Sequence, residues 1–112
     1  MIRAQFYRNP SGKIWGFEIR GHAGYEESGK DIICAAVSAL SINTVNSIEA
    51  LANEKPIVSE KDGMLSVEIA SLRKGKENSS ASLLLNALLL GLNSINADYG
   101  SSYLTVSSNY KA

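Results

Sequence analysis

Two side chains in this 112-residue chain stand out for the chemistry they could perform: the single cysteine, Cys34, and the single histidine, His22. A thiol beside an imidazole forms a nucleophile and base pair, in which the histidine takes the thiol proton and later protonates the leaving group. The two residues lie at opposite ends of a glycine-rich loop, 21–30. This pairing points to nucleophilic catalysis. Two plainer interpretations stay open: a small hydrophobic core residue for Cys34 and a solvated loop residue for His22.

Asp31 gives Cys34 a predicted position in the fold. It precedes apolar residues at helical spacing and is therefore the expected N-cap of a helix. Cys34 would then lie in the first turn, where backbone N–H groups are unpaired and the helix dipole is positive. Such a position stabilises a thiolate, and the same N–H groups could hold the oxyanion of an acyl-transfer intermediate. Asp31 has a second interpretation, as the group that orients His22.

Other residues near Cys34 also have two interpretations each. Ser38 follows one helical turn later and could hydrogen-bond the sulfur or a substrate, or bond the carbonyl group of Cys34. Gly21, Gly24 and Gly29 predict a mobile loop between the histidine and the helix, and they serve either as turn residues or as parts of a cover over the site. One cysteine and one histidine are too few for a zinc site, so neither a metal nor a cofactor is expected.

Hydrophobic periodicity predicts the elements that position these residues. Alternation indicates a first hairpin, with strands at 2–7 and 14–20 joined by the turn Asn9–Gly12. It indicates a second hairpin, with strands at 57–58 and 65–69 joined by an Asp-Gly turn. Spacings of three and four indicate a helix from Asp31 to about Asn53, and a second helix, capped by Ser79 or Ser80, whose leucines cover more than one face. Residues 73–78 are predicted to form a polar loop, and a last strand is predicted at 103–107. The predicted order is ββαββαβ, an α+β fold of two layers with an antiparallel sheet and two helices mostly on one face.

Composition sets outer limits on function. Hydrophobic residues make up 45% and charged residues 20%, which predicts a single globular domain over residues 1–112. The net charge of zero gives no basic field, so no direct nucleic-acid partner is expected. The longest apolar stretch, 81–92, is interrupted by Ser82, Asn86 and Gly91 and is too short for a bilayer, so no membrane partner is expected. With no signal peptide at the start, the predicted location is the cytoplasm, where a lone thiol stays reduced.

The segment around the two candidate residues resembles a known family. It reads Gly-His-Ala-Gly from Gly21, and then Gly-Lys-Asp-Ile-Ile-Cys-Ala-Ala-Val-Ser from Gly29 to Ser38. This pattern is similar to that of the bacterial ribosomal-processing cysteine protease family called Prp. The resemblance covers the whole chain and includes every element of the motif.

The resemblance implies a specific activity. Members of the family remove a short N-terminal extension from the large-subunit ribosomal protein numbered twenty-seven, at a site rich in apolar and aromatic residues. Cys34 would be the nucleophile and His22 the base, with Gly21, Gly24 and Gly29 in a loop over the site. Asp31 and Ser38 match positions with supporting or substrate-binding roles. The family is also expected to form homodimers, and a groove near Trp15, Tyr25 or the second helix would receive the substrate.

Two functions of other kinds stay open on the residues alone. One is a non-catalytic ribosome-assembly factor that binds a ribosomal protein or ribosomal RNA. The other is a thiol-dependent acyl transferase, which uses the same nucleophile with a different acceptor.

Overall fold

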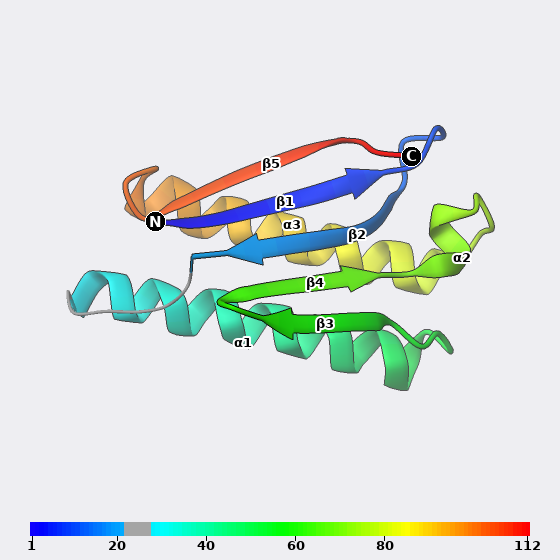
Figure 1. The fold of residues 1–112 in the computed structure, drawn as a ribbon, viewed down its shortest axis with the longest axis horizontal. Helices are drawn as coiled ribbons and strands as arrows, with labels where there is room; N and C mark the ends of the chain where they lie inside the picture. The colour runs from blue at the N-terminus through cyan, green and yellow to red at the C-terminus, as the bar shows by residue number, and fades with distance from the viewer. Residues whose placement is uncertain (22–27) are drawn as a thin grey trace.

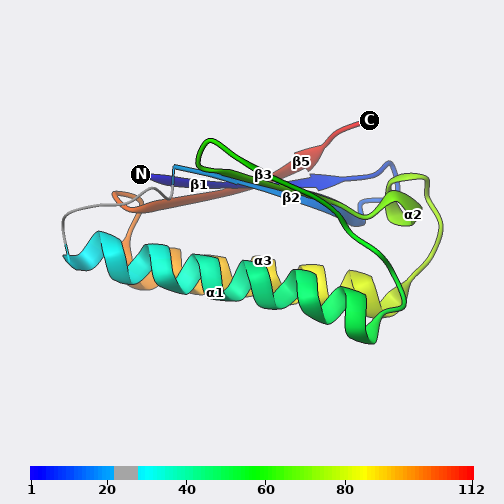
Figure 2. The same cartoon turned by 60° about the horizontal axis from the view of Figure 1, so that its bottom comes forward.

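The computed structural model describes the backbone of residues 1–21 and 28–112 and the side chains of residues 1–21 and 32–112. Within this part of the chain, a five-stranded sheet is covered on one face by two long helices (Figures 1 and 2). The predicted two-layer α+β class is confirmed. The elements, in chain order, are β1 (Ile2–Arg8), β2 (Ile14–Arg20), α1 (Ser28–Leu51), β3 (Ile57–Lys61), β4 (Met64–Glu68), α2 (Ala70–Arg73), α3 (Ser79–Tyr99) and β5 (Leu104–Tyr110).

Both predicted hairpins are present. β1 pairs antiparallel with β2, and β3 pairs antiparallel with β4. In the first turn the Asn9 side-chain oxygen accepts hydrogen bonds from the backbone N–H groups of Ser11 and Lys13, at 2.9 and 3.1 Å. In the second, Asp62 and Gly63 both have positive φ, 52° and 74°, as a two-residue hairpin turn of this kind requires.

The sheet is mixed, so the predicted antiparallel sheet is wrong at one edge. The strand order is β3-β4-β2-β1-β5, and β5 runs parallel to β1, with Leu104 beside Ile2. Hairpin turns define the direction only of the strands that they join directly. The last strand is reached through α3, which carries the chain back along the helix layer, so β5 enters the sheet in the direction of β1 (Figure 1).

Two local predictions about the second half of the chain are also wrong. A short helix, α2, covers Ala70–Arg73 before the expected polar loop. The N-cap of α3 is Asn78 rather than Ser79 or Ser80. The Asn78 side chain accepts a hydrogen bond from the N–H of Ala81 at 3.1 Å and donates one to the carbonyl of Ala52 at 2.9 Å. It therefore caps one helix and ties it to the chain beyond α1, which a serine side chain is too short to do.

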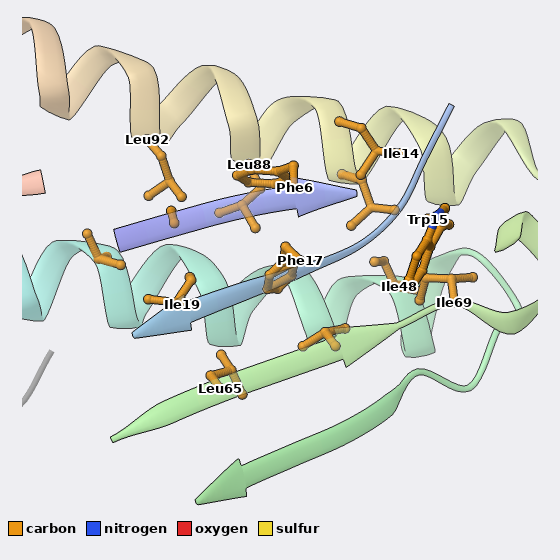
Figure 3. Close-up of a cluster of buried hydrophobic side chains, with 14 of the residues drawn as sticks. Phe6, Ile14, Trp15, Phe17, Ile19, Ile48, Leu65, Ile69, Leu88 and Leu92 are labelled. Atoms are coloured by element: carbon orange, nitrogen blue, oxygen red, sulfur yellow. The ribbon is translucent and has the colours of Figure 1, made fainter. Parts of the chain in front are cut away.

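The core lies between the sheet and the two long helices (Figure 3). Phe6 and Phe17 form its centre, with ring centroids 5.7 Å apart and both side chains fully buried. Each helix contributes one buried apolar stripe to it: Ile33, Val37 and Ile48 from α1, and Ala81, Leu85, Leu88 and Leu92 from α3. Leucines do cover a second face of α3, as predicted, and there Leu83 and Leu90 remain about 70% and 69% exposed.

Two helical segments, Ile32–Leu51 and Ser79–Tyr99, are long and apolar enough to cross a membrane by length and composition. This differs from the expectation of no such segment. Both pack a buried stripe against the sheet, with 33% of the first segment's window and 22% of the second's buried. The apolar composition of the two helices is accounted for in part by this packing.

Candidate active site

The two ends of the glycine-rich segment are brought to one end of the molecule. β2 ends at Arg20, α1 begins at Ser28, and both ends lie on the same side in Figure 1. His22 and Gly24 lie outside the described residues. The fold therefore places the end of β2, which leads into Gly21 and His22, and the beginning of α1, which carries Cys34, at the same end of the molecule.

Gly21 is required at its position for two physical reasons. Its φ is +80°, a left-handed conformation that costs a residue with a side chain about 1–2 kcal/mol. A Cβ atom there would also lie 2.3 Å from the carbonyl oxygen of Met1, at the start of β1. The N–H of Gly21 donates to the carbonyl of Gly63 at 3.3 Å. These contacts set the direction in which the chain leaves β2 toward His22.

Cys34 lies deeper in α1 than the sequence predicted. The helix begins at Ser28, so Cys34 is its seventh residue and Asp31 its fourth. Asp31 is therefore not the N-cap, and Gly29 is helical rather than part of a loop. Only the first four N–H groups of a helix lack intrahelical partners, so the N–H at Cys34 is not available to hold an oxyanion. The error has a simple cause: the first turn, 28–31, contains no apolar residue, and apolar periodicity cannot detect it.

The thiol of Cys34 is free and only half-buried. It packs against the edge of the core without entering it. A cysteine that served only to fill the core would be expected among the fully buried residues, as Ile33 and Val37 are. The partial exposure of Cys34 is what a nucleophilic residue requires and a purely structural one does not.

Ser38 lies one turn after Cys34 and lines a small open hollow. Its hydroxyl makes no hydrogen bond to any residue that the structure describes. Ser41 and Thr44, by contrast, donate to the carbonyls of Val37 and Leu40, both at 2.7 Å. The alternative in which Ser38 bonds the carbonyl of Cys34 is therefore wrong. Its hydroxyl is available to a bound molecule.

The hollow has a mainly apolar lining with one carboxylate. It is formed by α1 on one side and by the sheet on the other, with the residues Ile19, Val37, Ser38, Ser41, Ile42, Glu60 and Leu65. It involves neither Trp15, which is 3% exposed near the other end of β2, nor α3. Sequence reasoning missed Glu60 and Leu65, because only the strand pairing shows that they face α1. Among the described residues, no group of three His, Cys, Asp or Glu side chains is placed to hold a metal ion.

Comparison with known proteins shows the family of this chain. The sequence profile of the cysteine protease Prp family matches residues 1–104. This chain belongs to the cysteine protease Prp family. It is 32% identical over 101 residues to the ribosomal processing cysteine protease Prp of Bacillus subtilis, covering 88% of this chain and 90% of that protein. It is also 32% identical to Prp of Staphylococcus aureus, over 99% of this chain and all of that protein.

Solved structures agree with this membership. Prp of S. aureus in complex with a substrate peptide has a TM-score of 0.82 and 30% identity, over 99% of this chain and 100% of that one. The same enzyme with a covalently linked product peptide has a TM-score of 0.84 and 29% identity, over 97% and 100%. SMU.848 from Streptococcus mutans has a TM-score of 0.84 and 32% identity, over 99% of both chains. The chain is thus a ribosomal processing cysteine protease, and the non-catalytic alternative is not supported.

Proposed function

We propose that this enzyme removes the N-terminal extension of a large-subunit ribosomal protein, the protein numbered twenty-seven, with Cys34 as nucleophile and His22 as general base. The covalently linked product of the S. aureus relative carries the proposal. A covalent link to a peptide needs a nucleophilic side chain, and a cysteine protease supplies it from a thiol. This chain has a single cysteine, which is free and half-buried, and Ser38, one helical turn later, lines a hollow between α1 and the sheet.

The reaction then proceeds in two halves. His22 takes the proton of Cys34, and the thiolate attacks the scissile carbonyl carbon to form a tetrahedral oxyanion. Collapse of this intermediate breaks the C–N bond, and His22 gives its proton to the leaving amine. Water, activated by the same imidazole, then hydrolyses the thioester and releases the acyl half of the substrate. In this proposal Asp31 has a supporting or substrate-binding role and Gly24 belongs to the loop over the site, whereas Gly29 lies in the first turn of α1.

The hollow lined by Ser38 is the proposed contact site for an apolar side chain of the substrate. Ile19, Val37 and Leu65 offer an apolar wall, and packing an apolar side chain against it removes apolar surface from water. The hydroxyl of Ser38, one helical turn after Cys34, can bond the peptide backbone.

Cleavage of the extended ribosomal protein, followed by intact mass, tests the proposal. Cys34→Ala should retain the wild-type melting temperature, because it exchanges one small half-buried side chain for another, and should show no product. His22→Ala should lower the rate by roughly 100-fold or more. Its thiol should also react with iodoacetamide at the rate of an ordinary cysteine. Turnover near the wild-type rate in Cys34→Ala would refute the assignment, as would unchanged alkylation in His22→Ala.

A cytoplasmic homodimer completes the proposal. A free thiol nucleophile persists in a reducing compartment. Leu83 and Leu90 form an exposed apolar stripe on α3, and a C2 interface would cover it. Light scattering should give twice the 12.0 kDa chain mass. Leu83→Asp with Leu90→Asp should give monomers, whereas Asn43→Asp with Asn46→Asp, the same charge change on exposed positions of α1, should not. A wild-type mass of one chain would contradict the dimer.

A further inference from the structure

The basic side chains of this neutral protein are gathered at the end of the sheet away from Cys34. Six of the eleven lysines and arginines lie on three segments there: the β1–β2 turn, α2 with the turn after it, and the residue after β5. Figure 1 shows these segments together near the C-terminus, whereas the beginning of α1 lies at the opposite end. We call this surface the basic end; it comprises Arg8, Lys13, Arg73, Lys74, Lys76 and Lys111.

Contacts between the three segments hold the basic end together. The N–H of Lys111 donates to the carbonyl of Arg8 at 3.1 Å, and the indole N–H of Trp15 donates to the carbonyl of Lys111 at 3.2 Å. The Arg73 guanidinium lies 4.2 Å from the centre of the Trp15 ring and donates to the carbonyl of Ala112 at 2.6 Å. These contacts hold Arg8, Arg73 and Lys111 on one surface. Lys74 and Lys76 follow α2 directly and are exposed.

An aromatic pair lies under this surface. The rings of Tyr7 and Trp15 stack with centroids 5.4 Å apart and an interplanar angle of 25°. The Lys111 ammonium lies 4.5 Å from the centre of the Tyr7 ring, in cation–π geometry. Burial, and then the charge of Glu18, raises the pKa of the Tyr7 phenol, so the ring adds no negative charge here. The ring positions the Lys111 charge without neutralising it.

Four of the six cations have no ionic partner among the described residues. The carboxylate of Glu68 pairs with Arg73 at 3.0 Å, and that of Glu77 lies 3.8 Å from Lys13. The nearby Glu54 carboxylate accepts hydrogen bonds from Ser71 and Asn78 instead. The four cations without an ionic partner are Arg8, Lys74, Lys76 and Lys111. Their charges repel one another unless an anion lies among them.

We propose that the basic end binds the phosphate backbone of RNA. Four unpaired cations, carried by three segments that contact one another, match an extended polyanion with one charge per nucleotide better than a single small anion. The site lies at the other end of the molecule, so RNA and a substrate peptide can be bound together. The enzyme would thereby meet its substrate on the RNA of the assembling particle. The zero net charge predicted no nucleic-acid partner, but it does not describe this uneven distribution.

Fluorescence anisotropy with a fluorescein-labelled, single-stranded RNA of mixed sequence tests the proposal. Four phosphate contacts predict a slope of about −3 for log affinity against log salt, or about 50-fold weaker binding at 200 mM than at 50 mM KCl. Lys74→Gln with Lys76→Gln should halve the slope and reduce the salt effect to about 7-fold. The control Arg3→Gln with Lys61→Gln removes the same charge at the other end of the sheet and should keep the full slope.

Three results would overturn the proposal. The first is no RNA binding at low salt. The second is an equal loss of RNA affinity in the two double variants. The third is displacement of the RNA by polyglutamate at an equal concentration of charge. The last would mean that the surface binds acidic protein segments. Cleavage of a short peptide by Lys74→Gln with Lys76→Gln should stay at the wild-type rate, which shows that the variant is folded and that the loss concerns RNA alone.

Discussion

Replacing Gly21 by alanine tests whether the start of the catalytic segment is held in place by the fold. The new Cβ would lie 2.3 Å from the carbonyl oxygen of Met1 and must move away by roughly 1 Å to reach ordinary contact. The positive φ adds a cost of about 1–2 kcal/mol. Together these effects predict a loss of about 3 kcal/mol in the free energy of unfolding, or roughly 12 °C in the melting temperature.

The chain offers a matched control for this change. Gly12 has a similar φ, +85°, but a Cβ there would meet nothing within 4 Å. Gly12→Ala should therefore lower the free energy of unfolding only through backbone strain, by about 1–2 kcal/mol, and keep its activity. The comparison separates the contact with Met1 from the strain of a left-handed residue.

Activity provides the sharper measurement. His22 directly follows Gly21, and a 1 Å displacement of a catalytic group can cost about 100-fold in rate. We expect kcat/KM for the extended substrate to fall by about that factor in Gly21→Ala at a temperature where both variants are folded. If Gly21→Ala and Gly12→Ala cleave at similar rates, then the contact at Gly21 does not position the histidine, and the reasoning fails.

Three further predictions concern the core, the cap and the hollow. Phe17→Ala should lower the free energy of unfolding by about 3–5 kcal/mol in urea titrations, because the ring is fully buried against Phe6. Asn78→Ala should cost about 1–2 kcal/mol in the same titration, since α3 loses its cap and the Ala52 carbonyl loses its donor. Ser38→Ala should lower kcat/KM with little effect on stability, whereas Ser94→Ala, on α3 and outside the hollow, should leave kcat/KM near wild type; equal kinetics of the two variants would remove Ser38 from the site.

The elements predicted best are those whose evidence lies in a short stretch of sequence, such as alternation of apolar residues or a turn between adjacent strands. β1 and β2 alternate regularly and are joined by a turn with a clear mechanism, so their pairing could be inferred without the fold. The parallel partner of β1 could not be inferred in the same way. It depends on where α3 delivers the chain, and no residue between Tyr99 and Leu104 determines whether β5 joins one edge of the sheet or the other.

The same distinction applies to the site. The spacing from Cys34 to Ser38 is a property of one helix, and the structure does place both on the side of α1 toward the sheet. The opposite wall of the hollow comes from Glu60 and Leu65, which are paired across β3 and β4. Register decides which face such residues occupy, and a slip of one position would turn them away from α1. The substrate side of the site was therefore beyond sequence reasoning, although the proposed nucleophile was not.

Charge shows most clearly what a sum over the sequence leaves out. Net charge is additive, so its value of zero says nothing about which charges become neighbours. Arg8, Arg73 and Lys111 are far apart in the chain and are brought together because β5 lies beside β1 and α2 lies over the end of β2. Had β5 joined the other edge, beside β3, Lys111 would lie away from the Tyr7 ring, and the same composition would present no basic end. The proposed RNA-binding surface thus depends on the strand order of the sheet, which is the feature that the sequence predicted least well.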